Sequence, residues 1–225
     1  MKRILAAIIA AALLLSGCTS ASRPAESAPP TGTPSPSPTP VVPPTPEPEP
    51  ADGELVLVRD YIPGIFIDLK YATTDNFTGR VIYDSDEAYL RYGTVKKLLC
   101  AQNELSGRGL SLKIWDAYRP VSAQFKLWEI CPNPVYVSDP NNGYSKHSRA
   151  NTVDITLVTD TGKSIPMPSG FDDFTSLADR DYSDVSAEAA ENARLLENVM
   201  VENGFVPYSG EWWHYSDSVA YDVYG

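Results

Sequence analysis

The sequence predicts an α+β fold for residues 54–225. Segments with strand patterning and segments with helical spacing follow one another irregularly, without the repeated strand–helix–strand order of a parallel α/β protein. The composition also changes near residue 53, from proline-rich to rich in Tyr, Trp, Leu and Val. A stretch of about 170 such residues is enough for one domain with its own core.

The expected strands are short and are bounded by turn residues. A Pro63-Gly64 turn separates the first two strands, and a turn at 160–163 leads from the fourth strand into 164–166. Alternating or continuous apolar residues mark the expected strands at 55–58, 66–71, 110–115, 153–158, 205–208 and 212–215.

Three helices are expected between these strands. The first spans 84–105, with Asp84 or Ser85 as its cap and Gly107 as its stop. The second follows Pro120 and continues through Trp128. The third is capped by Ser186, places apolar residues on one face, and ends before Gly204.

Residues 1–17 have the plan of a bacterial export signal. A basic start is followed by an apolar run from Ile4 to Leu15, which is shorter than the roughly 20 residues of a membrane-spanning helix. The run closes with Leu15-Ser16-Gly17-Cys18, which resembles the lipobox of bacterial lipoproteins. We therefore expect lipidation at Cys18 and an extracytoplasmic protein anchored to the cell membrane. The alternative is an ordinary secretory signal with a chance cysteine.

Residues 18–53 are expected to form a disordered tether behind the lipidated cysteine. They hold most of the 20 prolines and almost no large apolar residues, so they cannot bury enough surface to offset chain entropy. Proline favours a semi-rigid, extended spacer.

The formal net charge of −11 and the lack of basic runs argue against nucleic acid or anionic lipid as partners. Two cysteines remain once Cys18 is assigned to the lipid. Cys100 and Cys131 either pair, as an exported protein permits, or stay as two separate thiols. Nothing in the sequence indicates the oligomeric state.

A candidate metal site comes from the chain's only two histidines. His147 precedes Asp154 by seven residues, and His214 follows Glu211 by three. Two imidazoles and a carboxylate suit a zinc ion that keeps a fourth position open, and a spare glutamate suits the base of a hydrolase. In an extended strand Glu211 and His214 face opposite ways, so a bend near Gly210 is expected to bring them together.

Arg119 lies just after an expected strand, in Asp116-Ala117-Tyr118-Arg119-Pro120. A planar, permanently charged guanidinium at a strand end is suited to binding a developing oxyanion. The alternative is an ordinary surface arginine.

Four motifs occur in order along the domain. They are Lys70-Tyr71-Ala72-Thr73-Thr74-Asp75-Asn76-Phe77-Thr78-Gly79, Tyr118-Arg119-Pro120, Ser145-x-His147-x6-Asp154 and Glu211-x-x-His214. Together they resemble the VanX-type D-alanyl-D-alanine dipeptidases, which share a fold with D-Ala-D-Ala carboxypeptidases and the hedgehog signalling domain. The resemblance implies helices packed on a central antiparallel sheet, and one zinc per chain bound by His147, Asp154 and His214. It further implies Glu211 as the base and Arg119 as the transition-state contact.

The same resemblance implies a small dipeptide substrate. Asp172 matches the residue that binds the substrate ammonium, although the adjacent Asp173 leaves that choice ambiguous by one position. Ser145, Tyr71 and Asp116 match residues that lie near the dipeptide or support the arginine. A buried carboxylate of this kind rejects substrates extended at the N-terminus, because an amide cannot replace the charge.

Two positions depart from the family pattern, and two other functions remain open. Ala150 stands where the family has glycine, which costs about 1 kcal/mol if that position has a positive φ. Thr152 replaces an alanine and adds a hydroxyl near the metal or a neighbour. The alternatives are a D,D- or L,D-carboxypeptidase acting on peptidoglycan stems, and a non-catalytic wall-binding lipoprotein.

Overall fold

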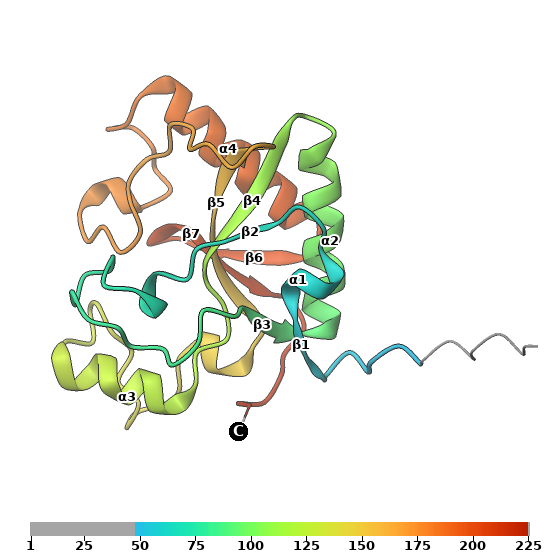
Figure 1. Cartoon of the computed structure of the whole chain (residues 1–225). Coiled ribbons are helices and arrows are strands. Elements are labelled where there is room, and N and C mark those ends of the chain that lie inside the picture. Colours follow the sequence, from blue (N-terminus) through green and yellow to red (C-terminus); the bar gives the residue numbers. More distant parts are fainter. Residues whose placement is uncertain (1–47, 225) are drawn as a thin grey trace, which may run out of the picture. The chain divides into compact units, whose positions relative to one another are not determined.

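A computed structural model describes residues 48–224 of the protein (Figure 1). The expected export signal, Cys18 and most of the expected tether lie outside these residues. Just before the expected domain start, Asp52 pairs with Lys96 at 2.6 Å. Along the chain the elements are β1 (Leu55–Leu57), α1 (Val58–Tyr61), β2 (Phe66–Ile67), η1 (Lys70–Ala72), β3 (Tyr89–Arg91), α2 (Tyr92–Ser106), β4 (Leu110–Asp116), α3 (Val121–Ile130), η2 (Lys146–Arg149), β5 (Thr152–Thr159), η3 (Ser176–Ala178), α4 (Ala187–Glu202), β6 (Phe205–Tyr208) and β7 (Glu211–Asp217).

The α+β class is confirmed, with a five-stranded sheet in the order β2-β4-β5-β7-β6. The four strands β4, β5, β7 and β6 pair antiparallel, as expected. The short edge strand β2 is parallel to β4, so the sheet as a whole is mixed. A separate two-stranded ladder joins β1 and β3.

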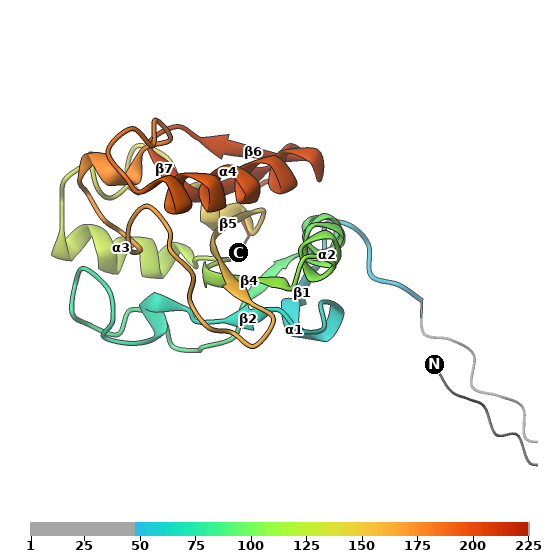
Figure 2. The ribbon, with the colours of Figure 1, turned by 90° about the horizontal axis from the view of Figure 1, so that it is seen from above.

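Helices α2 and α4 pack against each other and cover part of the sheet, with α2 against β4 and α4 against β6 (Figures 1 and 2). Val153 and Ile155 of β5 are fully buried and belong to the same apolar core as Leu98 of α2 and Leu196 of α4. Because side chains alternate along a strand, Asp154 points to the opposite face of the sheet. That face carries the candidate site.

The expected helix at 84–105 is wrong in its first part. Tyr89–Arg91 form strand β3, which pairs with β1, and helix α2 begins only at Tyr92. The Ser85 hydroxyl accepts a bond from the Glu87 N–H in a local turn, so it caps no helix. Pairing with a strand some thirty residues earlier therefore outweighs the helical spacing of the local sequence.

The expected strand at 66–71 is also too long, because it ends at Ile67 and Lys70–Ala72 form a 3₁₀ turn. The other expected elements are confirmed with small changes at their ends. Helix α4 is capped by the Ser186 hydroxyl, which accepts a bond from the Ala189 N–H, and Gly204 follows it at φ +85°. Within residues 48–224, none of the helices has the length and apolar character needed to cross a membrane.

Candidate active site

The three expected metal ligands lie together on one face of the sheet. Asp154 of β5 and His214 of β7 are direct cross-strand partners, and η2 brings His147 beside them. Asp154 Oδ1 lies 2.9 Å from His214 Nδ1, and Asp154 Oδ2 lies 3.3 Å from His147 Nε2. The two imidazole nitrogens are 3.4 Å apart.

These separations fit a tetrahedral metal ion. Ligand atoms that lie about 2.0–2.1 Å from a tetrahedral zinc are about 3.3 Å from one another. One ligand atom from each of the three buried residues lies within 4.8 Å of the others. Three protein ligands leave the fourth tetrahedral position for water or substrate.

Backbone contacts orient His147 toward this position. Its Nδ1–H donates to the Ala117 carbonyl at 2.9 Å, so Nε2, which faces Asp154, is the nitrogen that a metal can use. The Ser145 hydroxyl accepts from the His147 N–H and begins the 3₁₀ turn. Ala117 directly follows β4, so the sheet itself fixes the ring.

The charges in the cluster also favour a cation. Burial opposes ionisation of Asp154, but the two imidazoles outweigh it and lower its pKa below the usual range. Burial acts to lower the pKa of His147, yet the charges of Asp154 and Asp116 raise it overall. Burial lowers the pKa of His214, which favours the neutral imidazole that binds metals.

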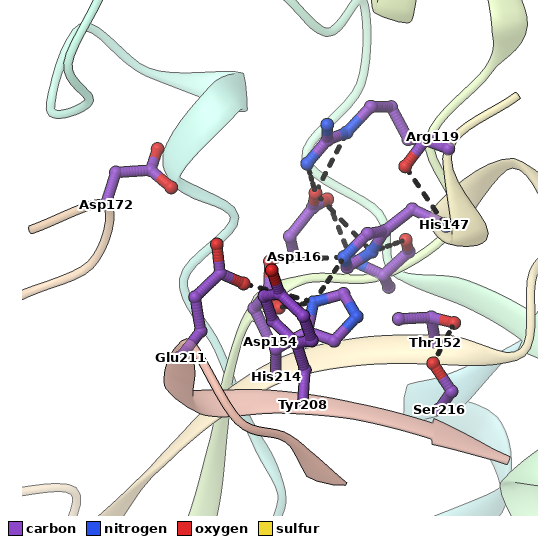
Figure 3. Close-up of polar contacts among 12 residues, drawn as sticks. Asp116, Arg119, His147, Thr152, Asp154, Asp172, Tyr208, Glu211, His214 and Ser216 are labelled. Carbon is purple, nitrogen blue, oxygen red and sulfur yellow. Dashed lines mark hydrogen bonds and ion pairs between the residues drawn. The ribbon is translucent and has the colours of Figure 1, made fainter. Parts of the chain in front are cut away.

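Glu211 reaches the same face as His214 because the β6–β7 ladder is irregular. Pro207 pairs with Tyr215, whereas the next residue, Tyr208, pairs with Glu211, so the register shifts at this point. Glu211 Oε2 consequently lies 3.5 Å from His214 Nδ1 (Figure 3). Burial raises the pKa of Glu211 to about 7, and the charges of Asp154 and Asp172 act in the same direction.

Arg119 is held rigidly beside the metal site (Figure 3). Asp116 Oδ2 accepts from its Nη2 at 2.6 Å and from its Nε at 3.2 Å, while Gln124 Oε1 accepts from its Nη1 at 2.9 Å. Its guanidinium carbon lies 5.0 Å from the centre of the Tyr71 ring. Burial acts to lower the pKa of Arg119, but the Asp116 carboxylate outweighs it and the pKa is raised.

Asp172 faces the cavity from the loop between β5 and α4. The Tyr71 hydroxyl donates to its Oδ2 at 2.7 Å, and burial raises its pKa to about 7. Its φ of +53° is a left-handed conformation that aspartate tolerates better than most residues. Asp173 instead accepts bonds from the Thr175 N–H and hydroxyl on the exposed side, so of the two acids only Asp172 lines the cavity.

A cavity of about 290 Å³ joins these side chains. It includes every expected metal, catalytic and substrate residue except Asp116, which is fully buried behind Arg119. The remaining walls come from the 134–138 segment, Lys146 and Tyr208. The lining residues that the sequence predicted are Tyr71, Arg119, Ser145, His147, Asp154, Asp172, Glu211 and His214.

The two departures from the family pattern have distinct consequences. Ala150 has φ +58° and ψ +28°, so the left-handed position is occupied by a residue with a Cβ. The Arg91 N–H donates to the Ala150 carbonyl, and the Ala150 N–H donates to the His147 carbonyl, which fixes the backbone there. The Thr152 hydroxyl donates to Ser216 Oγ at 3.0 Å, so it bonds to a neighbour and not to the metal ligands.

Several supporting residues had no sequence signal. Gln124 on α3 holds Arg119, and the Tyr83 hydroxyl donates to Asp116. Tyr208 lies with its ring centre 5.8 Å from that of His214. Only the three-dimensional fold brings these side chains to the site. In the described part of the chain Cys100 and Cys131 are both free thiols.

Comparison with known proteins assigns this chain to a family. The family model described as D-ala-D-ala dipeptidase, Peptidase_M15, matches residues 51–222. The chain belongs to this family. The D-alanyl-D-alanine dipeptidase of Escherichia coli is 39% identical over 162 residues, covering 72% of this chain and 83% of that protein. The dipeptidase of Enterococcus faecium is 35% identical over 176 residues, covering 69% and 87%.

A solved structure with a more distant likeness is VanYB in complex with D-alanine-D-alanine. It is 17% identical, with a TM-score of 0.41, and covers 60% of this chain and 75% of that one. A likeness at this level adds nothing to the assignment, which depends on the family match and on the relatives.

Proposed function

We propose that the protein is a zinc-dependent dipeptidase that hydrolyses D-alanyl-D-alanine, or closely related D-amino-acid dipeptides, in bacterial cell-wall metabolism. One observation carries the proposal. A single cavity combines a three-residue metal donor set, the spare carboxylate of Glu211 and the buried carboxylate of Asp172. The family and its dipeptidase relatives support the same activity.

His147, Asp154 and His214 would hold one zinc ion per chain. Bound there, zinc supplies the Lewis acidity that activates water and polarises a peptide carbonyl. The chain's own residues then supply the base, the oxyanion contact and the substrate anchor.

Glu211 acts as the general base. Its carboxylate takes a proton from the attacking water and passes it to the leaving amine nitrogen, so the proton ends on the released amino acid. A pKa of about 7 is close to the range in which a carboxylate transfers protons effectively at neutral pH. Glu211→Gln is expected to keep zinc and to lose about 10²–10⁴-fold in kcat.

Arg119 stabilises the negative charge that develops on the carbonyl oxygen. Its fork is already fixed by Asp116 and Gln124, so little reorganisation is needed when the charge appears. Asp116 therefore acts through Arg119, as a positioning residue.

Asp172 anchors the ammonium of the substrate, and Tyr71 holds Asp172 in place. An N-terminally extended peptide presents a neutral amide there, so a buried carboxylate is left without its charge partner. This contact favours a dipeptidase over a carboxypeptidase acting on longer stem peptides. Ser145 supports the site through His147.

The test is release of D-alanine from D-Ala-D-Ala by the purified domain. We expect activity that a chelator abolishes, that about one equivalent of zinc restores, and that zinc-loaded Glu211→Gln lacks. A zinc-loaded wild type that cleaves neither D-Ala-D-Ala nor related dipeptides, yet binds stem peptides tightly, would instead support a wall-binding lipoprotein.

We also propose that the protein is exported and anchored through lipid on Cys18. The basic start, the short apolar run and the Leu15-Ser16-Gly17-Cys18 motif support this proposal. Incorporation of labelled fatty acid into the full chain is the direct test. Wild type is expected to be labelled and to fractionate with membranes, whereas Cys18→Ser should lose the label; equal labelling of both would exclude Cys18.

A further inference from the structure

A free dipeptide carries a charge at each end, and the proposed function uses only one of them. Asp172 complements the ammonium, but the carboxylate at the other end enters a cavity lined by three acids, Asp154, Asp172 and Glu211. Like charges at this spacing repel, and a bound zinc ion offsets only part of that charge. The substrate carboxylate therefore needs a cationic partner of its own.

We propose that Lys146 binds the C-terminal carboxylate of the dipeptide and is a specificity-determining residue. The inference rests on the proposed dipeptidase function and extends it to the other end of the substrate. It assigns the role to a side chain that the metal-binding motif contains but does not use.

Arg119 and Lys146 are the only arginine and lysine residues that line the cavity. Arg119 is bound by Asp116 and Gln124, and its remaining N–H groups are proposed to meet the oxyanion. The ammonium of Lys146, by contrast, forms no hydrogen bond or ion pair with any of residues 48–224. Its ammonium is thus available to a ligand.

Lys146 lies next to Tyr208, which in turn lies next to the metal ligand His214. Its Nζ lies 5.8 Å from the centre of the Tyr208 ring, which in turn lies 5.8 Å from the centre of the His214 ring. In the view of Figure 3, Tyr208 and Asp172 lie on opposite sides of Glu211. The scissile bond lies between the two charged ends of a dipeptide, so its two anchors must lie on opposite sides of the reacting centre.

The reach of the side chain fits a dipeptide. Two extended residues span about 7 Å, and a lysine stem of four carbons can adjust its ammonium to a ligand of that length. Lys146 is exposed whereas its neighbours Ser145 and His147 are buried, so its stem can move without disturbing the ligand loop. A third amino acid at the C-terminus would carry the carboxylate beyond this contact.

The test compares D-Ala-D-Ala with its C-terminal amide, D-alanyl-D-alaninamide, in which the negative charge is absent. Lys146→Met is expected to lower kcat/KM for the free acid about tenfold, mainly through KM, and to leave kcat/KM for the amide unchanged. Lys146→Arg should keep most of the activity on the acid. Lys163→Met, at an exposed turn outside the cavity, is the matched control and should match wild type on both substrates.

The role of Lys146 and the dipeptidase function can fail separately. Suppose that the wild type hydrolyses D-Ala-D-Ala. If Lys146→Met then loses kcat/KM equally on the acid and the amide, or loses none on either, the role of Lys146 is overturned and the dipeptidase function stands. A zinc-loaded wild type without dipeptidase activity overturns the proposed function and the role of Lys146 with it. Zinc content is measured in every variant. A variant that displaces His147 and loses zinc is thereby distinguished from one that loses only the substrate contact.

Discussion

The Arg119–Asp116 pair gives the sharpest prediction about how the site is built. Asp116 is fully buried, and its carboxylate accepts bonds from the Arg119 guanidinium, the Tyr83 hydroxyl and the Ala117 N–H. Replacing Arg119 with alanine removes the only one of these partners that carries a charge. The carboxylate is then left in the interior without its guanidinium partner.

Two separate losses follow from that substitution. Breaking a buried ion pair from one side costs about 3–5 kcal/mol of unfolding free energy. Removing the oxyanion donor costs about 10²–10³-fold in kcat. Asp116→Asn added to Arg119→Ala removes the stranded charge, while its amide oxygen still accepts from Tyr83 and Ala117. The double variant should therefore regain about 1–3 kcal/mol of stability but none of the activity.

The assay combines denaturant unfolding of the zinc-loaded proteins with steady-state kinetics on D-Ala-D-Ala. We expect stability to differ between the single and double variants, and kcat to be low in both. Equal stability of the two variants would refute the buried pair. A rise in KM with kcat unchanged would refute the oxyanion role of Arg119 and would instead make it a substrate-carboxylate ligand.

Three further predictions concern proton binding, backbone strain and loop support. Burial raises the pKa values of Glu211 and Asp172 to about 7, and both carboxylates must be ionised for activity. The slope of log kcat/KM against pH should therefore exceed one on the acid side, and Asp172→Asn should bring the slope toward one. A slope that stays unchanged in that variant would contradict the anchor role. Ala150→Gly should raise the free energy of unfolding by about 0.5–1 kcal/mol, measured by thermal unfolding. The relief of strain at this left-handed position exceeds the conformational entropy that glycine adds to the unfolded chain. A loss of stability would show that the loop is not strained. Arg91 donates to the backbone carbonyls of Gly53, Arg149 and Asp222, and so ties the end of the His147 loop to the start and the end of the domain. Arg91→Met should therefore weaken zinc binding in a chelator competition, and unchanged affinity would exclude this support.

Local patterning predicted most of the fold, because most elements obey their own periodicity. The alternation in 110–115 and the apolar run in 153–158 correspond to β4 and β5, and Ser186 caps α4 as expected. The failure at residues 84–91 has a tertiary cause. Three residues there join a ladder with β1, and a strand of that length carries too little local signal to compete with helical spacing.

The site was partly predictable for a related reason. The metal donors and Glu211 stand in short motifs, and the resemblance of those motifs to a known family supplied their expected roles. Packing brings Gln124 to Arg119, and loop geometry brings Lys146 to the cavity, and no spacing along the chain records either contact. The bend that brings Glu211 to His214 was expected from Gly210, and its physical form is the register shift between β6 and β7.

The most direct test of the dipeptidase function is a competition between D-Ala-D-Ala and a stem pentapeptide that ends in D-Ala-D-Ala, with D-alanine release measured for each by the zinc-loaded enzyme. Anchoring of a free ammonium by Asp172 predicts a kcat/KM at least about 100-fold higher for the dipeptide. A pentapeptide cleaved as well as the dipeptide, or better, would contradict the anchor and make the protein a carboxypeptidase.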